Sequence, residues 1–318
     1  MISSERILME FLRDACRAGA VAINYAPVLD IVSEGRVARG VRVRDRISGA
    51  EHVIAARAVI NCAGPRVKQL ARGRGGDTER LFRPSLAFNI MLDRSLPMTI
   101  AVAVAAPRPD APVLFLVPGR GTLLAGTMHR PRSAEATQAI PTEAEIADFL
   151  AQLNEAVPGL EVGPGNVRRV FAGLLPATVA GSDELVTREM LLDHGRTGGT
   201  RGLYSVSGVK FTTAVDVARQ ALAMMGVTGV DTADASILPL SPATAILTDA
   251  RRFLESDAEA ARACLRRVIE EESVQFEDDL VLRRANWAST EADLDRVRAR
   301  TAQLVGLRSP MPGVLDCA

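Results

Sequence analysis

The sequence has few aromatic residues and no net charge. Phe, Tyr and Trp make up 4 % of its 318 residues, and 38 Lys and Arg are balanced by 38 Asp and Glu. Nucleic-acid-binding proteins usually carry a basic excess or a basic stripe, and base-stacking platforms and carbohydrate clefts need aromatic rings. We therefore expect no nucleic-acid partner, and an apolar core built mainly from Ala, Val and Leu.

Cysteine is scarce as well. Cys16, Cys62, Cys264 and Cys317 are far apart and form no C-x-x-C pair. This spacing disfavours a zinc site and a disulfide framework, and it fits a reducing cytosol. We expect no metal.

Long hydrophobic runs are also missing. The longest apolar run, MTIAVAVAAP from Met98, is about half the length that a membrane span needs. The N-terminal MISSERILMEF has neither the basic nor the apolar region of a signal peptide. We expect a cytoplasmic protein; no cationic amphipathic helix supports membrane association, and a peripheral position at the inner membrane stays open.

Helical and strand patterns alternate along the chain. A near-continuously apolar strand at 59–62 is typical of a strand buried on both faces in the middle of a parallel sheet. Residues 84–130 are rich in strand patterns, and Thr142 with Glu145 predicts a capping box that opens a helix. Further helices are expected at 5–17, 142–156, 212–225, 245–254, 258–273 and 291–304, and further strands at 20–23, 28–32 and 37–44.

Three apolar strands run into glycine turns, at Ala63-Gly64, Ala172-Gly173 and Ser207-Gly208. Glycine permits close approach of another group to the backbone, although each turn on its own is also compatible with an ordinary strand end. The third turn opens a helix, whose free N–H groups suit an anion or a polar ring edge. Thr212 or Thr213 can cap that helix, and Lys210 adds a positive charge there.

Taken together, these segments resemble the aerobic-type, FAD-dependent glycerol-3-phosphate dehydrogenases of the D-amino-acid-oxidase-like flavoprotein family. The resemblance covers nearly the whole chain, from about residue 4 to residue 307. Its most specific parts are GVKFTT and FEDDLVLRR. The matching segments are NCAGPRV from Asn61, GTMH from Gly126, AGLLPA from Ala172, GVKFTT from Gly208 and FEDDLVLRRANWA from Phe276.

The resemblance implies an α/β fold that binds FAD. It divides the chain into a partial FAD-binding doubly wound domain at 1–80, a β-rich α+β substrate domain at 81–200, a return segment at 201–232 and a helical C-terminal domain at 233–318. The FAD-binding domain is incomplete because the strand–turn–helix unit with G-x-G-x-x-G, which opens the family's fold, is not present in this sequence. GRGTLLAG at Gly119 lacks the third glycine. We therefore expect weak or no retention of FAD.

The resemblance also implies residue roles. Lys210 would bind the anionic group of the substrate or stabilise the reduced flavin, with a plain surface lysine as the alternative. Thr127 would contact the substrate. His129 would take the proton from the substrate's hydroxyl or ammonium group, with a plain polar cap as the alternative. The residues expected to contact FAD are Val28, Ala63, Gly64, Gly173, Gly208, Val209, Phe211 and Thr212.

One substrate residue of the family is replaced. Leu175 stands where the family has an arginine that holds the anionic group of the substrate, and leucine offers no bidentate contact to phosphate. Arg168 and Arg169 lie nearby on the same predicted strand. Because adjacent strand residues face opposite sides, at most one of them can take over that role.

Other polar residues have a structural interpretation. Asp278 and Asp279 are spaced from Arg283 and Arg284 for ion pairs along a helix, which indicates a structural network rather than catalysis. Trp287 is expected to anchor packing. His52 and His194 lie in predicted turns and receive no role.

The leading hypothesis is an FAD-dependent dehydrogenase that transfers hydride from a small polyol phosphate to flavin and passes electrons to a quinone or a soluble acceptor. A second hypothesis is an amine or hydroxy-acid oxidoreductase of the same family, which Leu175 mildly favours. A third is an inactive fragment, or a subunit that needs a nucleotide-binding partner.

Overall fold

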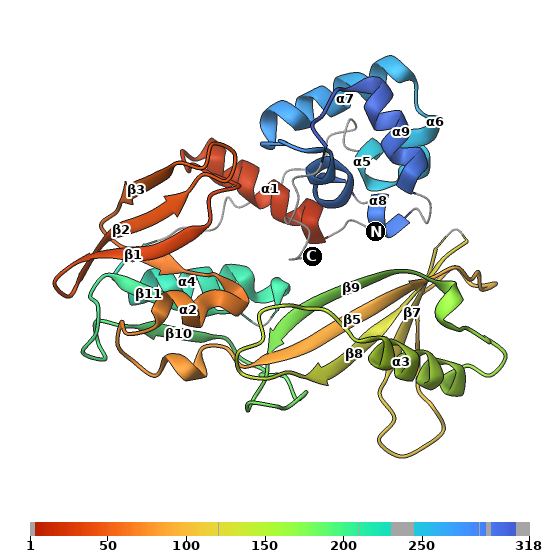
Figure 1. Ribbon diagram of the computed structural model, residues 1–318, viewed down its shortest axis with the longest axis horizontal. Helices are drawn as coiled ribbons and strands as arrows, with labels where there is room; N and C mark the ends of the chain where they lie inside the picture. The colour runs from red at the N-terminus through yellow and green to blue at the C-terminus, as the bar shows by residue number, and fades with distance from the viewer. Residues whose placement is uncertain are drawn as a thin grey trace.

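The computed structural model describes residues 4–119, 121–208, 210–229, 245–285, 287–290 and 294–309. The strands form three β-sheets, and Figure 1 shows the helices from the C-terminal part of the chain at the upper right, above the sheet that contains β5, β8 and β9. This mixture of helices and sheets confirms the predicted α/β class.

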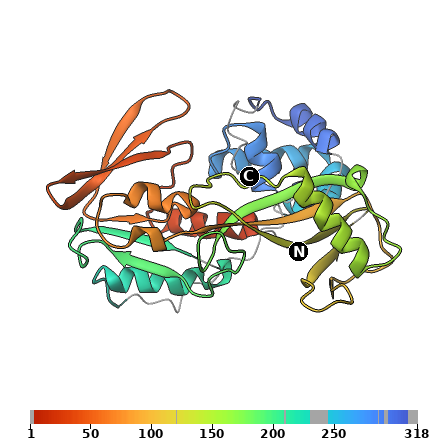
Figure 2. The same ribbon diagram turned by 60° about the horizontal axis from the view of Figure 1, so that its bottom comes forward.

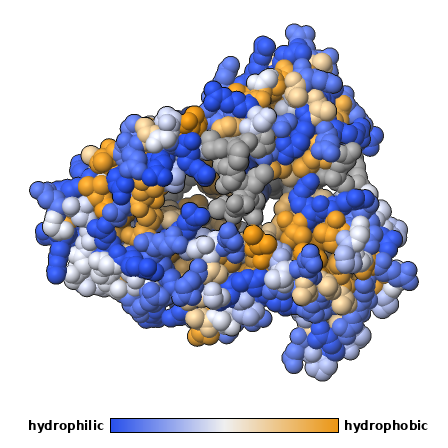
Figure 3. All heavy atoms as spheres, in the orientation of Figure 1, coloured by the Kyte–Doolittle hydropathy of each residue, from blue (hydrophilic) through white to orange (hydrophobic). Residues whose placement is uncertain are grey.

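The first sheet is an antiparallel meander. It contains β1 (Val28–Glu34), β2 (Val37–Arg44) and β3 (Glu51–Ala55), in that order. In Figure 2 it projects from the rest of the molecule, and all five residues of β3 are exposed. Figure 3 shows apolar atoms on the surface over this sheet, at the left of the view, where Val53 is 62 % exposed.

The second sheet holds two of the glycine turns. Its strands are β4 (Val59–Asn61), β10 (Met190–Asp193) and β11 (Leu203–Ser207), and β11 pairs parallel with β4 and antiparallel with β10. Helix α4 (Ala214–Met224) packs on one face through Val217 against Val206. On the other face lies α2 (Val67–Ala71), whose first carbonyl accepts a hydrogen bond from Asn61.

The expectation that β4 lies in the middle of a parallel sheet is wrong. β4 is three residues long, and Ile60 is 39 % exposed. In the described part of the chain its only strand partner is β11. The apolar sequence therefore lies at a sheet edge.

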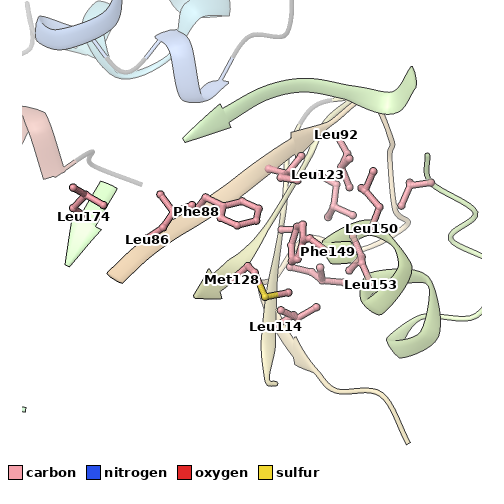
Figure 4. Close-up of a cluster of buried hydrophobic side chains, with 14 of the residues drawn as sticks. Leu86, Phe88, Leu92, Leu114, Leu123, Met128, Phe149, Leu150, Leu153 and Leu174 are labelled. Carbon is pink, nitrogen blue, oxygen red and sulfur yellow. The ribbon is translucent and has the colours of Figure 1, made fainter. Parts of the chain in front are cut away.

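The third sheet is antiparallel and has the order β6-β7-β8-β5-β9. Helix α3 (Glu143–Ala156) covers one face, and Figure 4 shows Phe149 of this helix among core side chains of the sheet. Both halves of the predicted capping box form at Thr142 and Glu145. The strands are β5 (Pro84–Leu92), β6 (Val102–Val104), β7 (Leu114–Pro118), β8 (Leu123–Pro131) and β9 (Val167–Pro176).

The C-terminal helices enclose a separate apolar core. Trp287 is fully buried, stacks on Phe253 with ring centroids 4.2 Å apart, and donates a hydrogen bond to the carbonyl of Ile246. This confirms its predicted role as a packing anchor. The elements are α5 (Ala245–Thr248), α6 (Ala250–Glu255), α7 (Ala258–Glu271), the π-helix η6 (Asp279–Arg284), α8 (Trp287–Thr290) and α9 (Leu294–Leu304).

Helix α1 (Ser4–Arg17) is attached to these C-terminal helices rather than to a sheet. The guanidinium of Arg6, which is 1 % exposed, donates to both carboxylate oxygens of Glu272, at 2.8 and 2.5 Å. The expectation of a strand after this helix, at residues 20–23, is wrong. Residues 20–23 pair with no strand in the described part of the chain, and Val21 is 83 % exposed.

Two glycine-rich loops join the first sheet to the second. The N–H of Thr200 donates to the carbonyl of Arg74 at 2.7 Å, and the Arg74 side chain continues to Asp30 on β1 at 2.8 Å. The backbones touch closely, because a Cβ atom added to Gly199 would lie 1.9 Å from the Arg74 carbonyl oxygen. Only glycine fits this position without a shift of backbone.

We predict that Gly199→Ala lowers the free energy of unfolding by about 2 kcal/mol or more, because the new methyl group must push two backbone segments apart. Gly165→Ala is the matched control, since both glycines have ordinary φ angles and Gly165 has no atom within 4 Å of the added Cβ. Urea unfolding of both variants measures the difference. Equal stability of the two would contradict the close contact.

Candidate functional site

Two of the three glycine turns lie at one edge of the second sheet. β4 and β11 run parallel with Asn61 opposite Ser205, so Gly64 and Gly208 follow the same ends of neighbouring strands. In α/β folds, ligands bind at this edge of the parallel strands. β9, which carries Gly173, contacts the short helix η1 (Gly64–Arg66). The turn expected at Ala172-Gly173 is wrong, because Gly173 lies inside β9, where it pairs with Ala87 of β5.

Open space lies beside the backbone at these glycines. A Cβ atom added to Gly64, Gly173 or Gly208 would meet no other heavy atom within 4 Å. Gly64 also has φ +55°, a conformation that favours glycine. In addition, the hydroxyl of Ser207 is buried and has no partner in the described part of the chain. These features fit a planar group that lies against the backbone.

A buried chain of hydrogen bonds holds the first turn. His194 Nδ1 lies 2.6 Å from the carbonyl oxygen of Gly75, and its Nε2 lies 2.9 Å from the hydroxyl of Ser205. That hydroxyl also accepts from Asn61 Nδ2 at 3.3 Å, and Asn61 Oδ1 accepts from the Ala63 N–H at 3.2 Å. Because a carbonyl can only accept, Nδ1 carries the proton and Nε2 accepts from Ser205.

His194 was given no role from the sequence. It is fully buried, and this burial lowers its pKa. The signal that could have identified it is the presence of Asn61, Ser205 and Ser207 in otherwise apolar strands, because buried polar groups need partners.

The turn at Gly208 differs from expectation in how the following helix is capped. The Thr213 hydroxyl donates to the carbonyl of Lys210 at 2.9 Å and does not cap α4, which follows the short helix η4 (Phe211–Thr213). Lys210 and Thr212 are exposed, and Phe211 is 45 % exposed. Val209, another expected FAD contact, is outside the described residues.

Val28 lies in a different sheet from the glycine turns of β4 and β11. It begins β1, pairs with Val43 and is 37 % exposed. Its predicted contact with FAD stays a prediction.

The face of the third sheet opposite α3 brings the expected substrate residues together. Phe88 and Ile90 point into the core with α3, so Ala87 and Asn89 lie on the other face. Ala87 pairs with His129 on one side and with Gly173 on the other. Thr127 lies beside them on β8 and donates to Asn89 Oδ1 at 2.8 Å. His129, Thr127 and Gly173 therefore share one face.

His129 is half-buried on this face. Its Nδ1 is buried and has no hydrogen-bond partner in the described part of the chain. Burial lowers the pKa of His129, and the nearby charge of Asp183 opposes this effect only in part. Burial therefore favours the neutral form of this imidazole.

Neither neighbouring arginine replaces the arginine that the family has at the position of Leu175. Arg168 points to solvent and pairs with Asp93. Arg169 shares the face of Leu175, but it precedes Leu175 by six residues on the strand, about 20 Å. Its guanidinium instead donates to the carbonyl of Ala288 and lies over the ring of Phe171.

Asp278 and Asp279, at the start of η6, have structural partners that differ from the expected Arg283 and Arg284. Asp279 accepts from the Tyr25 hydroxyl at 2.6 Å, and burial with this bond raises the pKa of Tyr25 to about 12. Its other oxygen accepts from two backbone N–H groups of the preceding turn. Asp278 pairs with Arg298 on α9 at 2.5 Å. The carboxylates thus join elements instead of pairing along one helix.

A cleft of about 800 Å³ lies between α1 and α7. Leu8, Leu12 and Ile23 supply its apolar side, and Arg13 and Glu271 lie at its rim. It contains none of the residues expected to bind FAD or substrate. No helix in the described ranges is long and apolar enough to cross a membrane.

Comparison with known proteins identifies the class. The family model described as FAD dependent oxidoreductase (DAO) matches residues 1–224. The chain belongs to this family, as the fold and the glycine turns indicate, and FAD is the cofactor of the family.

The similar curated proteins include glycerol-3-phosphate dehydrogenases. The mitochondrial enzyme SDP6 of Arabidopsis thaliana is 28 % identical over 214 residues, which cover 65 % of this chain and 33 % of that protein. The aerobic enzyme of Bacillus subtilis is 24 % identical over 65 % of this chain and 37 % of its own. The chain thus spans about a third of the length of these relatives.

A solved structure shows the same fold. The glycerol-3-phosphate dehydrogenase of Bacillus halodurans, complexed with FAD, superposes with a TM-score of 0.71 and 21 % identity. The match covers 94 % of this chain and 68 % of that chain.

We predict that acid weakens the fold through His194. Its pKa is lowered in the folded state, so its contribution to stability is present above the unfolded pKa of about 6.5 and is lost as the pH falls through the lower folded value. The free energy of unfolding, measured with urea from about pH 7.5 to about pH 5, should fall less steeply in His194→Gln than in the unmodified protein.

The control is His52→Gln on the exposed strand β3. In His52→Gln the free energy of unfolding should fall with pH as steeply as in the unmodified protein, because His194 is still present. His129 is unchanged in both variants and does not affect the comparison. Parallel pH profiles for His194→Gln and the unmodified protein would contradict the buried neutral imidazole.

Proposed function

We propose that this chain carries the substrate-binding sheet and part of the FAD site of a dehydrogenase that oxidises a small polyol phosphate resembling glycerol 3-phosphate. The observation that carries the proposal is that Gly64 and Gly208 follow the same ends of two parallel strands with open space beside each, while His129 and Gly173 share one face of the neighbouring sheet. The glycerol-3-phosphate dehydrogenases among the relatives support the substrate class.

The residues fit the cofactor through backbone and small side chains. Ala63 and Gly64 would hold the nucleotide part, and Gly208 and Phe211 would lie along the flavin ring. When bound, FAD accepts hydride from the substrate and releases electrons to a quinone or a soluble acceptor. The first turn of η4 and α4 offers N–H groups and the positive end of a helix dipole, which stabilise negative charge at that place.

His129 is the proposed base. Its imidazole, whose pKa burial lowers, would accept the proton of the substrate's hydroxyl as the carbon is oxidised. Lys210 is the proposed cation for the anionic group; it is exposed just before η4, where the helix end adds N–H donors.

A hydroxy-acid or amine substrate is the second candidate, and one observation favours it. With Leu175 in place of the arginine, and with Arg168 and Arg169 both turned to other partners, no guanidinium on β9 is placed to hold a phosphate. A carboxylate needs less positive charge than a phosphate. A third proposal, a subunit that acts with a nucleotide-binding partner, is supported by the exposed edge of β4.

We predict that Gly208→Val weakens FAD binding at least about tenfold, because the new side chain fills space that the flavin needs. An added Cβ atom at Gly208 meets no other heavy atom within 4 Å, so we expect little change in thermal stability. Gly165→Val is the matched control. Quenching of FAD fluorescence measures affinity, for the chain alone and co-expressed with a G-x-G-x-x-G unit from a relative, which we expect to tighten binding. A protein that stays colourless in both cases would refute the flavin site.

We also predict that Leu175→Arg lowers the KM for sn-glycerol 3-phosphate about tenfold in the FAD-loaded protein, because a bidentate donor is restored beside the substrate face. Leu175→Lys should give a smaller gain, and Leu175→Met none. The measurement is the rate of flavin bleaching against substrate concentration. An unchanged KM in Leu175→Arg would show that the anionic group binds elsewhere.

A further inference from the structure

Asn89 is a polar residue inside an apolar strand, and residues of the neighbouring strand accommodate its side chain. β5 reads PSLAFNIML, with Leu86, Phe88, Ile90 and Leu92 in the core. Asparagine is depleted in strands, and a half-buried carboxamide is costly unless it is hydrogen-bonded. Asn89 lies on the face that also bears His129 and Gly173.

One half of the carboxamide is fixed by the neighbouring strand. The Thr127 hydroxyl donates to Asn89 Oδ1 at 2.8 Å. The strand pairing shifts at this point, so that Gly126 and Thr127 together lie opposite Asn89. Gly126 makes the space for the oxygen, because a Cβ atom there would lie 1.7 Å from Asn89 Oδ1.

The other half of the carboxamide is free. In the described part of the chain, Asn89 Nδ2 has no hydrogen-bond partner, so its two N–H groups are available on the substrate face. On β9 the residue opposite Asn89 is Phe171, whose ring forms an apolar neighbour. A polar donor held in place beside an apolar ring is suited to bind one particular group of a ligand.

We propose that Asn89 is a specificity-determining residue that donates hydrogen bonds from Nδ2 to an oxygen of the substrate. This inference rests on the proposed function and narrows its substrate class. An amide nitrogen donates and cannot accept, so it pairs with hydroxyl, carboxylate or phosphate oxygens and meets an ammonium group donor to donor. Where the substituent of the reacting carbon faces Asn89, a hydroxyl group is therefore favoured over an ammonium group.

The test replaces the donor by an acceptor of the same shape. In Asn89→Asp the Thr127 hydroxyl still has an oxygen to which it can donate, so the fold is kept, while the group that faces the substrate becomes negative. Asn89→Ala removes the donor without adding charge. Gln152→Glu, on α3 at the opposite face of the sheet, is the matched control for an amide-to-acid change.

Binding of sn-glycerol 3-phosphate, glycolate and glycine is measured by calorimetry on the full chain, with and without FAD, and flavin bleaching is recorded for the FAD-loaded protein. The unmodified chain should bind glycerol 3-phosphate or glycolate more tightly than glycine. Asn89→Ala should weaken that binding about tenfold and Asn89→Asp about a hundredfold or more. Gln152→Glu should match the unmodified protein, and thermal melting should show that each variant is folded.

Three outcomes overturn the inference. The first is unchanged affinity for the oxygen ligands in Asn89→Ala. The second is a preference of the unmodified chain for glycine, and the third is no binding of any ligand in either form. If glycerol 3-phosphate bleaches the flavin with the same KM in Asn89→Ala, the inference fails while the proposed function stands. If oxygen ligands bind through Asn89 but bleach nothing, the proposed dehydrogenase function fails instead.

Discussion

The parallel pairing of β4 with β11 is the constraint on which the candidate site depends. It brings together residues 61 and 205, and it carries the turns at Gly64 and Gly208 to one edge. Because β4 and β11 are short, the hydrogen bonds between them are too few to fix the position of the turns on their own. The buried chain from His194 through Ser205 to Asn61 adds side-chain bonds at the same level and continues into the Ala63 N–H. A polar network that is fully satisfied in this way specifies one arrangement of the turn.

At the other end of the molecule a buried ion pair fixes the position of helix α1. Arg6 and Glu272 are separated by 266 positions in sequence, and both are buried. A buried pair of this kind contributes little net stability against an apolar alternative, but loss of one partner leaves the other charge buried and is costly. The pair therefore determines where α1 lies: on the C-terminal helices, with its remaining apolar side chains, such as Leu8, left 48 % exposed.

Features that depend on residue type and short-range spacing were predicted correctly from the sequence. The capping box at Thr142 and the anchor role of Trp287 follow from residue type and spacing, and both are present. Features that depend on non-local pairing were missed. The apolar runs at 20–23 and 59–61 look like buried strands, yet whether a strand is buried depends on partners elsewhere in the chain. Asn89 was missed because its donor role appears only when Thr127 and Gly126 lie opposite it.

The polar side chains on β9, β5 and β8 bear on the proposed substrate. An arginine in place of Leu175 could hold a phosphate by two parallel hydrogen bonds. The two nearby arginines, Arg168 and Arg169, are bound to other partners. What remains on the sheet face is a neutral imidazole at His129 and an uncharged donor at Asn89. In the proposed function this face would bind the hydroxyl group and accept its proton, and Lys210 with the helix end would bind the anionic group. The proposal therefore divides recognition of the hydroxyl and of the anion between two sheets, which meet where β9 contacts η1.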